Sequence, residues 1–401
     1  MSNALDCRFL ETAAEIAAMR ADWEALLKST RSSDLLLSHH WYHTWRRVFG
    51  SRVRNGVVTV RRSGALIALM PIMIGRVLRS PSMAVRHDYM AGDEKFLAGR
   101  SRFRLIPIRQ LSPILGLEAS MWRGDPLVAP GEKDSSCDAL LHFFRDFAGW
   151  DVAVFPLPES FVNSIEAACR MIGVRVRIDR LHRPMYRRAD LPPWDAFLKA
   201  KGGHFRKRSG AVIKRANKEG LTFQTFAGPE DIGRGLAVVA EVAKRSWKAS
   251  GREGQAVLVP YTPASQRFFE ALCSDTDGGT VPVVSAIYQD GTPKAAFLSA
   301  AFGKRLVTLL TFYDPSIKHA SPGHLLIKMA YEWAADRGMT EIDFNSNNPF
   351  SAVYADRHEV YHNLTLFNGS LYGRVLHALS QPSRHHSEIE TSFPSAGASE
   401  P

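Results

Sequence analysis

The sequence contains few cysteines and no long hydrophobic run. Only four of its 401 residues are cysteine, and they are scattered without the paired spacing of a metal site: Cys7, Cys137, Cys169 and Cys273. The longest apolar run, 65–74, falls far short of the roughly 20 residues that a membrane-spanning helix requires, and it contains Pro71. We therefore expect reduced thiols, no membrane span and a cytoplasmic protein.

The N-terminus also lacks the pattern of a secretory signal. Residues 1–20 carry Asp6, Glu11 and Glu15 within a helical pattern that extends to Lys28, whereas a signal peptide begins basic and continues apolar. A second helix is predicted over 38–49. It contains His39, His40 and His43, but no carboxylate or cysteine nearby completes a set of metal ligands, so we expect no metal.

Length and composition indicate two folded domains. A chain of 401 residues with 45% hydrophobic residues can fill two cores. The proline pair after Asp190 and Leu191 breaks the pattern, so we expect an N-terminal unit over 1–190 and a C-terminal unit over 191–379. Residues 380–401 are polar and rich in serine and proline, and we expect a disordered tail. The irregular stretch 75–131 predicts no element.

Two patterns recur in the same order in both halves of the chain. In the first, two valines with a hydroxyl residue, a glycine and an alanine follow one another: 57–59 with Gly64 and Ala68, then 283–285 with Gly291 and Ala295, with the same four-residue step from glycine to alanine. In the second, a helix, a glycine and a strand follow one another: 140–147, Gly149 and 150–155, then 325–335, Gly338 and 339–344. The repeats predict an α/β fold with mixed sheets, built from two related units in tandem. Chance similarity of short apolar strands is the alternative.

The helix predicted over 324–337 begins with features that suit an anion. Ser321 can serve as its N-cap, Pro322 fits its first position, and Gly323 lets a ligand approach the backbone. Free N–H groups and the positive end of the helix dipole would then meet a pyrophosphate. An ordinary capped helix that packs on a sheet is the alternative.

The formal net charge of +11 is concentrated in one segment. Eight basic residues lie between Lys199 and Lys218, and Glu219 is the single acid of the segment. The pattern predicts a helix over 204–218. Phosphates of a cofactor, an anionic glycan or lipid surface, or a nucleic acid such as tRNA would balance this charge. A solvated helix face is the alternative. Base stacking on RNA is disfavoured because Phe205 is the only aromatic residue of the segment.

Several of these motifs together resemble a known family. The strands 283–288, 295–298 and 306–312, the Ser-Pro-Gly helix start and the strand 341–344 resemble the C-terminal half of the CelD-like acetyltransferases. This family belongs to the GNAT superfamily and is similar to the Fem peptidyltransferases. The resemblance extends to the basic helix and, more weakly, to 40–41 and 66–71, and it implies two GNAT-like units.

Acyl transfer from a thioester needs positioning, a base, and a donor for the developing oxyanion. Asp343 and Asn345, at the end of a strand beside the helix, and Tyr313 are the catalytic candidates; Asp314 and Tyr354 are further ones. A buried acid that caps the neighbouring backbone is the alternative role for Asp343. The residues expected to bind the cofactor are Ser321, Gly323, His324, Arg206 and Arg208.

The chain departs from the family pattern after Asp343-Phe344. Asn345 and Asn347 stand where glycine or small residues are expected, and Phe350-Ser351 where the family has an aromatic residue followed by lysine. The missing lysine puts the usual acceptor, or catalysis itself, in question.

We therefore expect an acyltransferase that moves an acyl group from acetyl-CoA or another acyl-CoA to an amine or hydroxyl. The acceptor would be a small molecule or a glycan, in envelope polysaccharide biosynthesis. A Fem-like aminoacyl-tRNA-dependent transferase and a non-catalytic accessory protein of polysaccharide synthesis are the alternatives, and tRNA is the less favoured partner.

Overall fold

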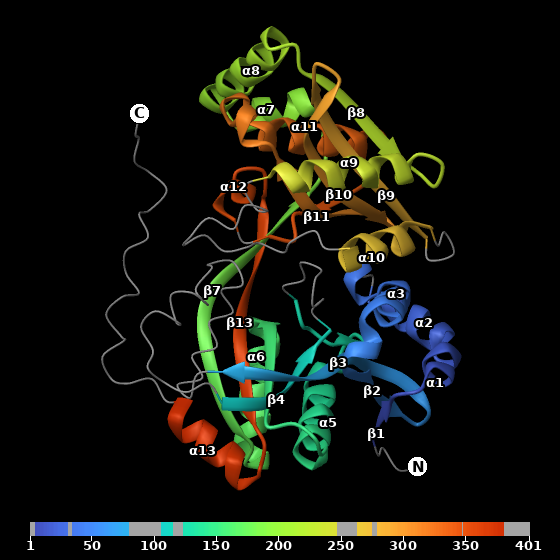
Figure 1. Ribbon diagram of the computed structural model, residues 1–401. Helices are drawn as coiled ribbons and strands as arrows, with labels where there is room; N and C mark the ends of the chain where they lie inside the picture. The colour runs from blue at the N-terminus through green and yellow to red at the C-terminus, as the bar shows by residue number, and fades with distance from the viewer. Residues whose placement is uncertain are drawn as a thin grey trace.

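The computed structural model describes residues 5–30, 34–79, 106–114, 123–246, 263–274, 279–346 and 348–380 (Figure 1). Three parts of the chain lie outside the described residues: most of the stretch 75–131, for which no element is predicted, Asn347, and the predicted tail except Ser380. Within the described part, no helix has the length and apolar character needed to cross a membrane.

One mixed sheet of 13 strands runs through the molecule. The first part of the chain contributes β1 (Leu5–Leu10), β2 (Arg54–Arg62), β3 (Ala65–Arg79), β4 (Ile106–Pro113), β5 (Leu127–Val128), β6 (Val152–Pro158) and β7 (Arg175–Ala189). The second part contributes β8 (Thr222–Ala227), β9 (Thr280–Gln289), β10 (Thr292–Phe302), β11 (Arg305–Tyr313), β12 (Glu341–Asp343) and β13 (Arg357–Phe367).

The helices cover both faces of this sheet. The first part holds α1 (Ala13–Ala18), α2 (Arg20–Ser29), α3 (His39–Phe49), α5 (Lys133–Asp146) and α6 (Glu159–Ile172), with the short 3-10 helix η1 (Leu35–Leu37). The second holds α7 (Trp194–Ala200), α8 (Gly203–Lys218), α9 (Ile232–Arg245), α10 (Pro263–Ser274), α11 (Pro322–Asp336), α12 (Pro349–Ala352) and α13 (Leu371–Ser380), with the 3-10 helix η4 (Pro315–Ala320).

The strand order is symmetric about its centre. It runs β1-β2-β3-β4-β6-β13-β7-β12-β11-β10-β9-β8, so that β3 and β10, β4 and β11, and β6 and β12 occupy matching places. The pairing directions match as well, because β4 and β6 are parallel and so are β11 and β12, whereas the hairpins β2–β3 and β9–β10 are antiparallel. This confirms the mixed α/β fold with two related units in tandem.

The two units exchange their central strands. β7, from the first part of the chain, pairs with β12, and β13, from the second part, pairs with β6. β7 and β13 also pair with each other and run side by side from one unit into the other (Figure 1). The sheet is therefore continuous across the expected boundary near Asp190.

Three large cores hold the helices on the sheet. One lies under α7, α8 and α11, and another lies between α5, α6 and strands of the N-terminal unit. The third joins the two units, because α1–α3 meet α9 and α10 there. Trp41 packs edge-on against Phe268 with ring centroids 4.9 Å apart, and His40 Nε2 lies 3.1 Å from the Leu272 carbonyl. Trp41 and His40 of α3 thus pack between the units, whereas His43 is exposed.

The helix predicted over the first 28 residues is wrong in its first part. Leu5–Leu10 form β1, which pairs antiparallel with β2 along the edge of the sheet. The helix begins only after Thr12, whose hydroxyl accepts the Glu15 N–H while Glu15 reaches back to the Thr12 N–H. The predictions over 38–49, 204–218 and 324–337 are confirmed as α3, α8 and α11 to within two residues at each end.

Candidate active site

Strands β11 and β12 separate soon after they begin. Their parallel pairing ends at Val307 and Asp343, although β11 continues to Tyr313. Just beyond the last pair, the Thr308 hydroxyl donates a hydrogen bond of 2.6 Å to the Phe344 carbonyl. Asn345 then adopts a left-handed conformation with φ 42°, which turns the chain out of the strand. We call this branching point, between 307–313 and 343–346, the β11/β12 fork.

Asp343 lies at the base of the fork and is fully buried. Its carboxylate accepts hydrogen bonds from Arg123, from Arg187 Nε at 3.2 Å, and from the Asn345 N–H at 2.8 Å. Burial opposes ionisation, but the guanidinium groups of Arg123 and Arg187 outweigh it and lower the pKa of Asp343. A carboxylate held this firmly as an anion is a weak proton acceptor at neutral pH.

The charged cluster around Asp343 draws residues from both units. Arg123 Nη1 also donates to Asp34 at 2.8 Å, and Arg305, at the start of β11, lies 3.1 Å from Glu341 and 3.5 Å from Asp34. Asp34 and Arg123 come from the N-terminal unit, whereas Arg305 and Glu341 belong to strands of the C-terminal unit. The fork thus rests on ion pairs that cross between units.

Asp125 follows at the edge of the cluster. The Tyr361 hydroxyl donates to its carboxylate at 3.2 Å. Burial raises the pKa of Asp125 to about 6, against the lowering effect of Arg123. Asp125 is therefore an acid that changes charge near neutral pH at the edge of the charged cluster.

Helix α11 begins where the sequence predicts, but its cap differs. Pro322 occupies the first position, and Ser321 stands in the N-cap position in a left-handed conformation with φ 55° and ψ 56°. The Ser321 side chain makes no capping hydrogen bond; its backbone carbonyl accepts the His324 N–H at 3.0 Å instead. Ser321 therefore occupies the predicted N-cap position and accepts through its backbone carbonyl in place of its side chain. Because Pro322 has no N–H, the Gly323 N–H is the first-turn donor that this carbonyl does not take.

Gly323 keeps the start of α11 accessible. A Cβ atom at this position would lie 3.2 Å from the ring of Phe350, whose exposed fraction is 43%. The glycine therefore lets the exposed Phe350 ring lie close to the helix terminus, where a larger residue would push the ring aside.

His324 is buried and connects three segments. Its Nε2 lies 2.9 Å from the Ser209 hydroxyl on α8, and its Nδ1 lies 2.6 Å from the Tyr354 hydroxyl after α12. Burial, with the charges of Arg208 and Lys328, lowers the pKa of His324 to about 4. The imidazole is neutral at physiological pH, so one of its nitrogens donates and the other accepts.

The basic helix α8 lies against the start of α11. Ser209, Val212 and Ala216 are its buried residues, and Arg206 and Arg208 are exposed. The charge of Arg208 acts on both His324 and Tyr354, and Arg215 Nη1 donates to the His319 carbonyl in η4 at 2.6 Å. A row of exposed cations is therefore fixed beside the first turn of α11.

The structure brings the predicted residues together in two groups. Ser321, Gly323 and His324 lie at the start of α11 beside α8, whereas Asp343 and Asn345 lie at the base of the fork. Tyr313 ends β11, six residues beyond Val307, which corresponds to roughly 20 Å along the strand. Tyr313 is therefore remote from Asp343 and near the loop that leads to α11.

Sequence reasoning missed Arg123, Asp34 and Ser209. Arg123 is separated from Asp343 by 220 positions and Asp34 from Arg123 by 89, so no local pattern relates them. Ser209 does carry a signal, because it stands alone as a small polar residue on the buried face of a basic helix.

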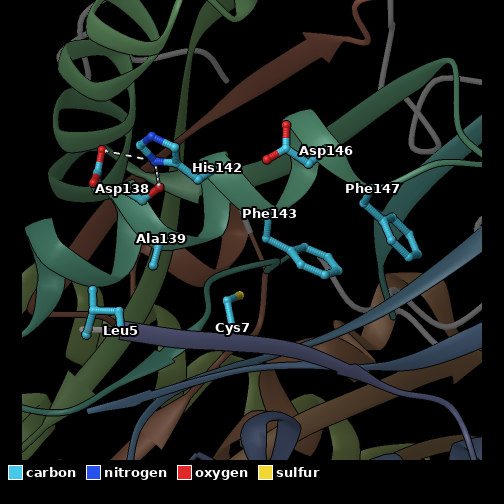
Figure 2. A pocket seen from close by; sticks show the side chains of 8 residues that line it. All are labelled: Leu5, Cys7, Asp138, Ala139, His142, Phe143, Asp146 and Phe147. Carbon is cyan, nitrogen blue, oxygen red and sulfur yellow. Dashed lines mark hydrogen bonds and ion pairs between the residues drawn. The ribbon is translucent and has the colours of Figure 1, made fainter. Parts of the chain in front are cut away.

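A pocket of about 540 Å³ opens in the N-terminal unit between β1 and α5 (Figure 2). Asp138, His142 and Asp146 line one side, and His142 Nδ1 lies 3.0 Å from the Asp138 carbonyl oxygen. The two carboxylates would repel phosphates. Cys7 also lines the pocket, and burial raises the pKa of its thiol to about 12, so it is no nucleophile at neutral pH. This pocket suits neither a cofactor phosphate nor covalent catalysis.

In the described residues, no group of His, Cys, Asp and Glu side chains is arranged to hold a metal ion.

Residues 203–354, from the start of α8 to Tyr354, match the family model of the acetyltransferase (GNAT) domain. FemX has the same fold with a TM-score of 0.57 at 13% identity, over 89% of this chain and 98% of that one. The chain has a tandem GNAT-like fold. The matched domain includes every predicted site residue, so the GNAT match and the candidate site coincide.

Two further solved structures share the fold. The C-terminal domain (DUF2156) of a protein described as a lysylphosphatidylglycerol synthetase from Agrobacterium fabrum has a TM-score of 0.52 at 14% identity, covering 91% of this chain and 96% of that one. L-PGS from Bacillus licheniformis has a TM-score of 0.50 at 15% identity, covering 92% and 96%. At these identities the likeness concerns the fold alone. A search of curated proteins finds no match.

Proposed function

We propose that the chain is an acyltransferase that takes an acyl group from an acyl-CoA, with acetyl-CoA the first choice, and passes it to an amine or hydroxyl. One observation carries the proposal: the β11/β12 fork lies between the ion cluster and a helix start that is flanked by exposed cations. An acyl-CoA fits this arrangement, because its pyrophosphate would bind at the helix start and its extended arm would carry the thioester into the fork.

The start of α11 fits the pyrophosphate. The positive end of its dipole and the Gly323 N–H favour an anion, and Gly323 adds no side chain of its own beside the Phe350 ring. Arg206 and Arg208 on α8 add positive charge within the same region. His324 is neutral and fully engaged with Ser209 and Tyr354, so it orients the two helices and does not neutralise phosphate charge.

The residues at the fork would orient the reacting groups. The acceptor amine or hydroxyl attacks the thioester carbonyl of the acyl donor and loses a proton, and the C–S bond then breaks so that CoA leaves as the thiol. Asp343, already paired with two arginines, holds the turn that presents Asn345 at the base of the fork. We assign Asn345 to the developing oxyanion and Tyr313, at the far end of β11, to the donor arm, because acyl transfer depends mainly on positioning and on stabilisation of the oxyanion.

The finer assignment follows the sequence. We propose that the protein is CelD-like and serves envelope polysaccharide biosynthesis in the cytoplasm, with a glycan or small molecule as acceptor. A Fem-like aminoacyl-tRNA-dependent transferase is the second candidate, and the exposed cations of α8 favour it because they would also suit a nucleic-acid backbone.

A thermal-shift screen separates these candidates. Acetyl-CoA, longer acyl-CoAs and free CoA should each raise the Tm of the intact protein, because a ligand that binds only the folded state stabilises it. Stabilisation by tRNA that persists in the presence of heparin, without a response to any CoA, would favour the second candidate. No response to either, together with a protein that co-purifies, would leave a non-catalytic accessory role.

A further inference from the structure

The N-terminal unit contains the counterpart of the β11/β12 fork. Strands β4 and β6 are parallel, like β11 and β12, and their pairing ends at Leu111 and Ala153 while β6 continues to Pro158. On the other side, Ala68 of β3 faces Val128 of β5, just as Ala295 of β10 faces Tyr313 of β11. By this register, β4 and β5 together correspond to the single strand β11.

This second fork is closed by the chain itself. Residues 123–126 lead into β5, and the Gly124 N–H donates to the Pro156 carbonyl on β6 at 2.9 Å. A Cβ atom on Gly124 would lie 2.4 Å from Cγ of Pro113, at the end of β4, and 3.0 Å from Cδ of Pro156. The segment therefore lies in contact with the ends of both strands, where only glycine fits. We call residues 123–126 the filling segment.

The helix that follows is also unsuited to an anion. α5, the counterpart of α11, begins after Glu132 and carries Asp134 in its first turn, whereas α11 has no acidic residue there. Glu132 is paired with Arg62 at 2.9 Å. Carboxylates at a helix start already satisfy the positive dipole end and repel phosphate.

The filling segment reaches the other unit through Arg123. The Arg123 side chain is buried and forms ion pairs with two carboxylates: Asp34 of the N-terminal unit, and Asp343 at the base of the β11/β12 fork. Asp343 in turn accepts the Asn345 N–H and so holds the turn that ends β12. A side chain from the closed fork thus supports the base of the open one.

We propose that the protein binds a single acyl-CoA, in the C-terminal unit, and that Arg123 is a positioning residue that keeps the β11/β12 fork in its binding geometry. In the N-terminal unit, the filling segment occupies the place where an acyl-CoA would bind. Through Arg123, the same segment stabilises the β11/β12 fork of the C-terminal unit. This inference rests on the proposed function for the identity of the ligand. The positioning role of Arg123 does not depend on that function.

The first test is the stoichiometry of binding. Isothermal titration of the full chain with acetyl-CoA should give one site per chain. Two sites per chain would overturn the inference while leaving the proposed function intact. No binding at all would contradict the proposed function, and the second test would then decide the role of Arg123 alone.

The second test uses amide hydrogen exchange, which needs no ligand. In Arg123→Gln, peptides covering 305–313 and 341–346 should exchange at least several-fold faster than in the parent, while those covering β2 and β3 should not change. Arg109→Gln is the matched control, because it removes an arginine that is paired with Asp151 at 2.7 Å within the N-terminal unit only. Where acetyl-CoA binds the parent, its Kd should rise at least about tenfold in Arg123→Gln and stay the same in Arg109→Gln.

A conservative variant guards against loss of folding. Arg123→Lys keeps the charge but cannot fork between two carboxylates, so it should show the same local change to a smaller extent. Unchanged exchange at 341–346 in a folded Arg123 variant, or an equal increase throughout the molecule, would contradict a positioning role.

Discussion

At the residue scale, His324 shows how one side chain defines the environment of a site. Its two ring nitrogens lie within hydrogen-bonding distance of Ser209 and Tyr354, which come from different elements than α11. In a charged imidazole both nitrogens carry a proton, so neither could accept a hydrogen bond from a hydroxyl. The contacts with Ser209 and Tyr354 therefore suit the neutral ring. The same contacts fix the distance between the cations of α8 and the first turn of α11.

This environment predicts a specific pH dependence of stability. The pKa of His324 is lowered to about 4 in the folded state from an ordinary 6.5, so the unfolded chain binds an extra proton between these values. Stability from this residue is therefore complete above about pH 6.5 and is lost as the pH falls toward 4. Between pH 7 and pH 4.5, the parent should lose about 2 to 3 kcal/mol relative to His324→Gln.

Urea unfolding of both proteins across this pH range measures the difference directly. The comparison with the variant is necessary because Asp125, whose pKa is raised to about 6, acts with the opposite sign. Parallel pH curves for the parent and His324→Gln would show that the imidazole is not held neutral.

Tyr354→Phe tests the second hydrogen bond of the imidazole. The variant keeps the ring, which packs against Phe350 and Phe344, and removes only the hydroxyl. It should cost about 1 to 3 kcal/mol of unfolding free energy, because a buried ring nitrogen is left without its partner. Tyr372→Phe, which removes an exposed hydroxyl bonded to the Pro107 carbonyl, is the control and should cost less. Equal losses would argue against a special role for the His324 bond.

At the element scale, α8 combines a buried face with an exposed row of cations. Replacing Arg206, Lys207 and Arg208 by Gln keeps helix propensity and removes three charges from the exposed side. The fold should survive, while acyl-CoA affinity falls and loses much of its salt dependence.

The matched control removes three exposed cations from other helices. Lys28, Arg47 and Arg170 lie on α2, α3 and α6, so their replacement by Gln changes the net charge equally but leaves α8 intact. Its affinity and salt slope should stay near those of the parent. Equal slopes for both triple variants would identify α8 as an ordinary solvated face.

Periodic elements could be predicted from the sequence, but contacts between distant segments could not. α8 and α11 follow from local signals, namely regular spacing of apolar residues and, for α11, the Pro-Gly start. β1 was mistaken for helix because a short alternating run at a sheet edge is decided by its partner strand β2. Asp343 was recognised as important, but its arginine partners were not, since ion pairs between distant segments depend on the tertiary fold.

At the scale of the whole molecule, the exchange of β7 and β13 joins the two units into one structure. Each unit contains a central strand from the other half of the chain, and one hydrophobic core contains residues of both. Neither unit can unfold without exposing the edge or the core of the other.

Calorimetry tests this coupling. The parent should unfold in a single transition whose calorimetric and van't Hoff enthalpies agree, as expected for one cooperative structure. Two resolved transitions would show that the units are energetically separate in spite of the shared sheet.

The central claim is that acyl-CoA binds at the start of α11, and Gly323→Val tests it most directly. Gly233 occupies the same second position in α9, and a Cβ atom there would have no neighbour within 4 Å among the described residues, so Gly233→Val is the matched control. In isothermal titration with acetyl-CoA, Gly323→Val should bind at least about tenfold more weakly than the parent, equivalent to roughly 1.4 kcal/mol, and Gly233→Val should bind equally well. A folded Gly323→Val variant with the parent's affinity, or a parent that binds no acyl-CoA, would contradict the account.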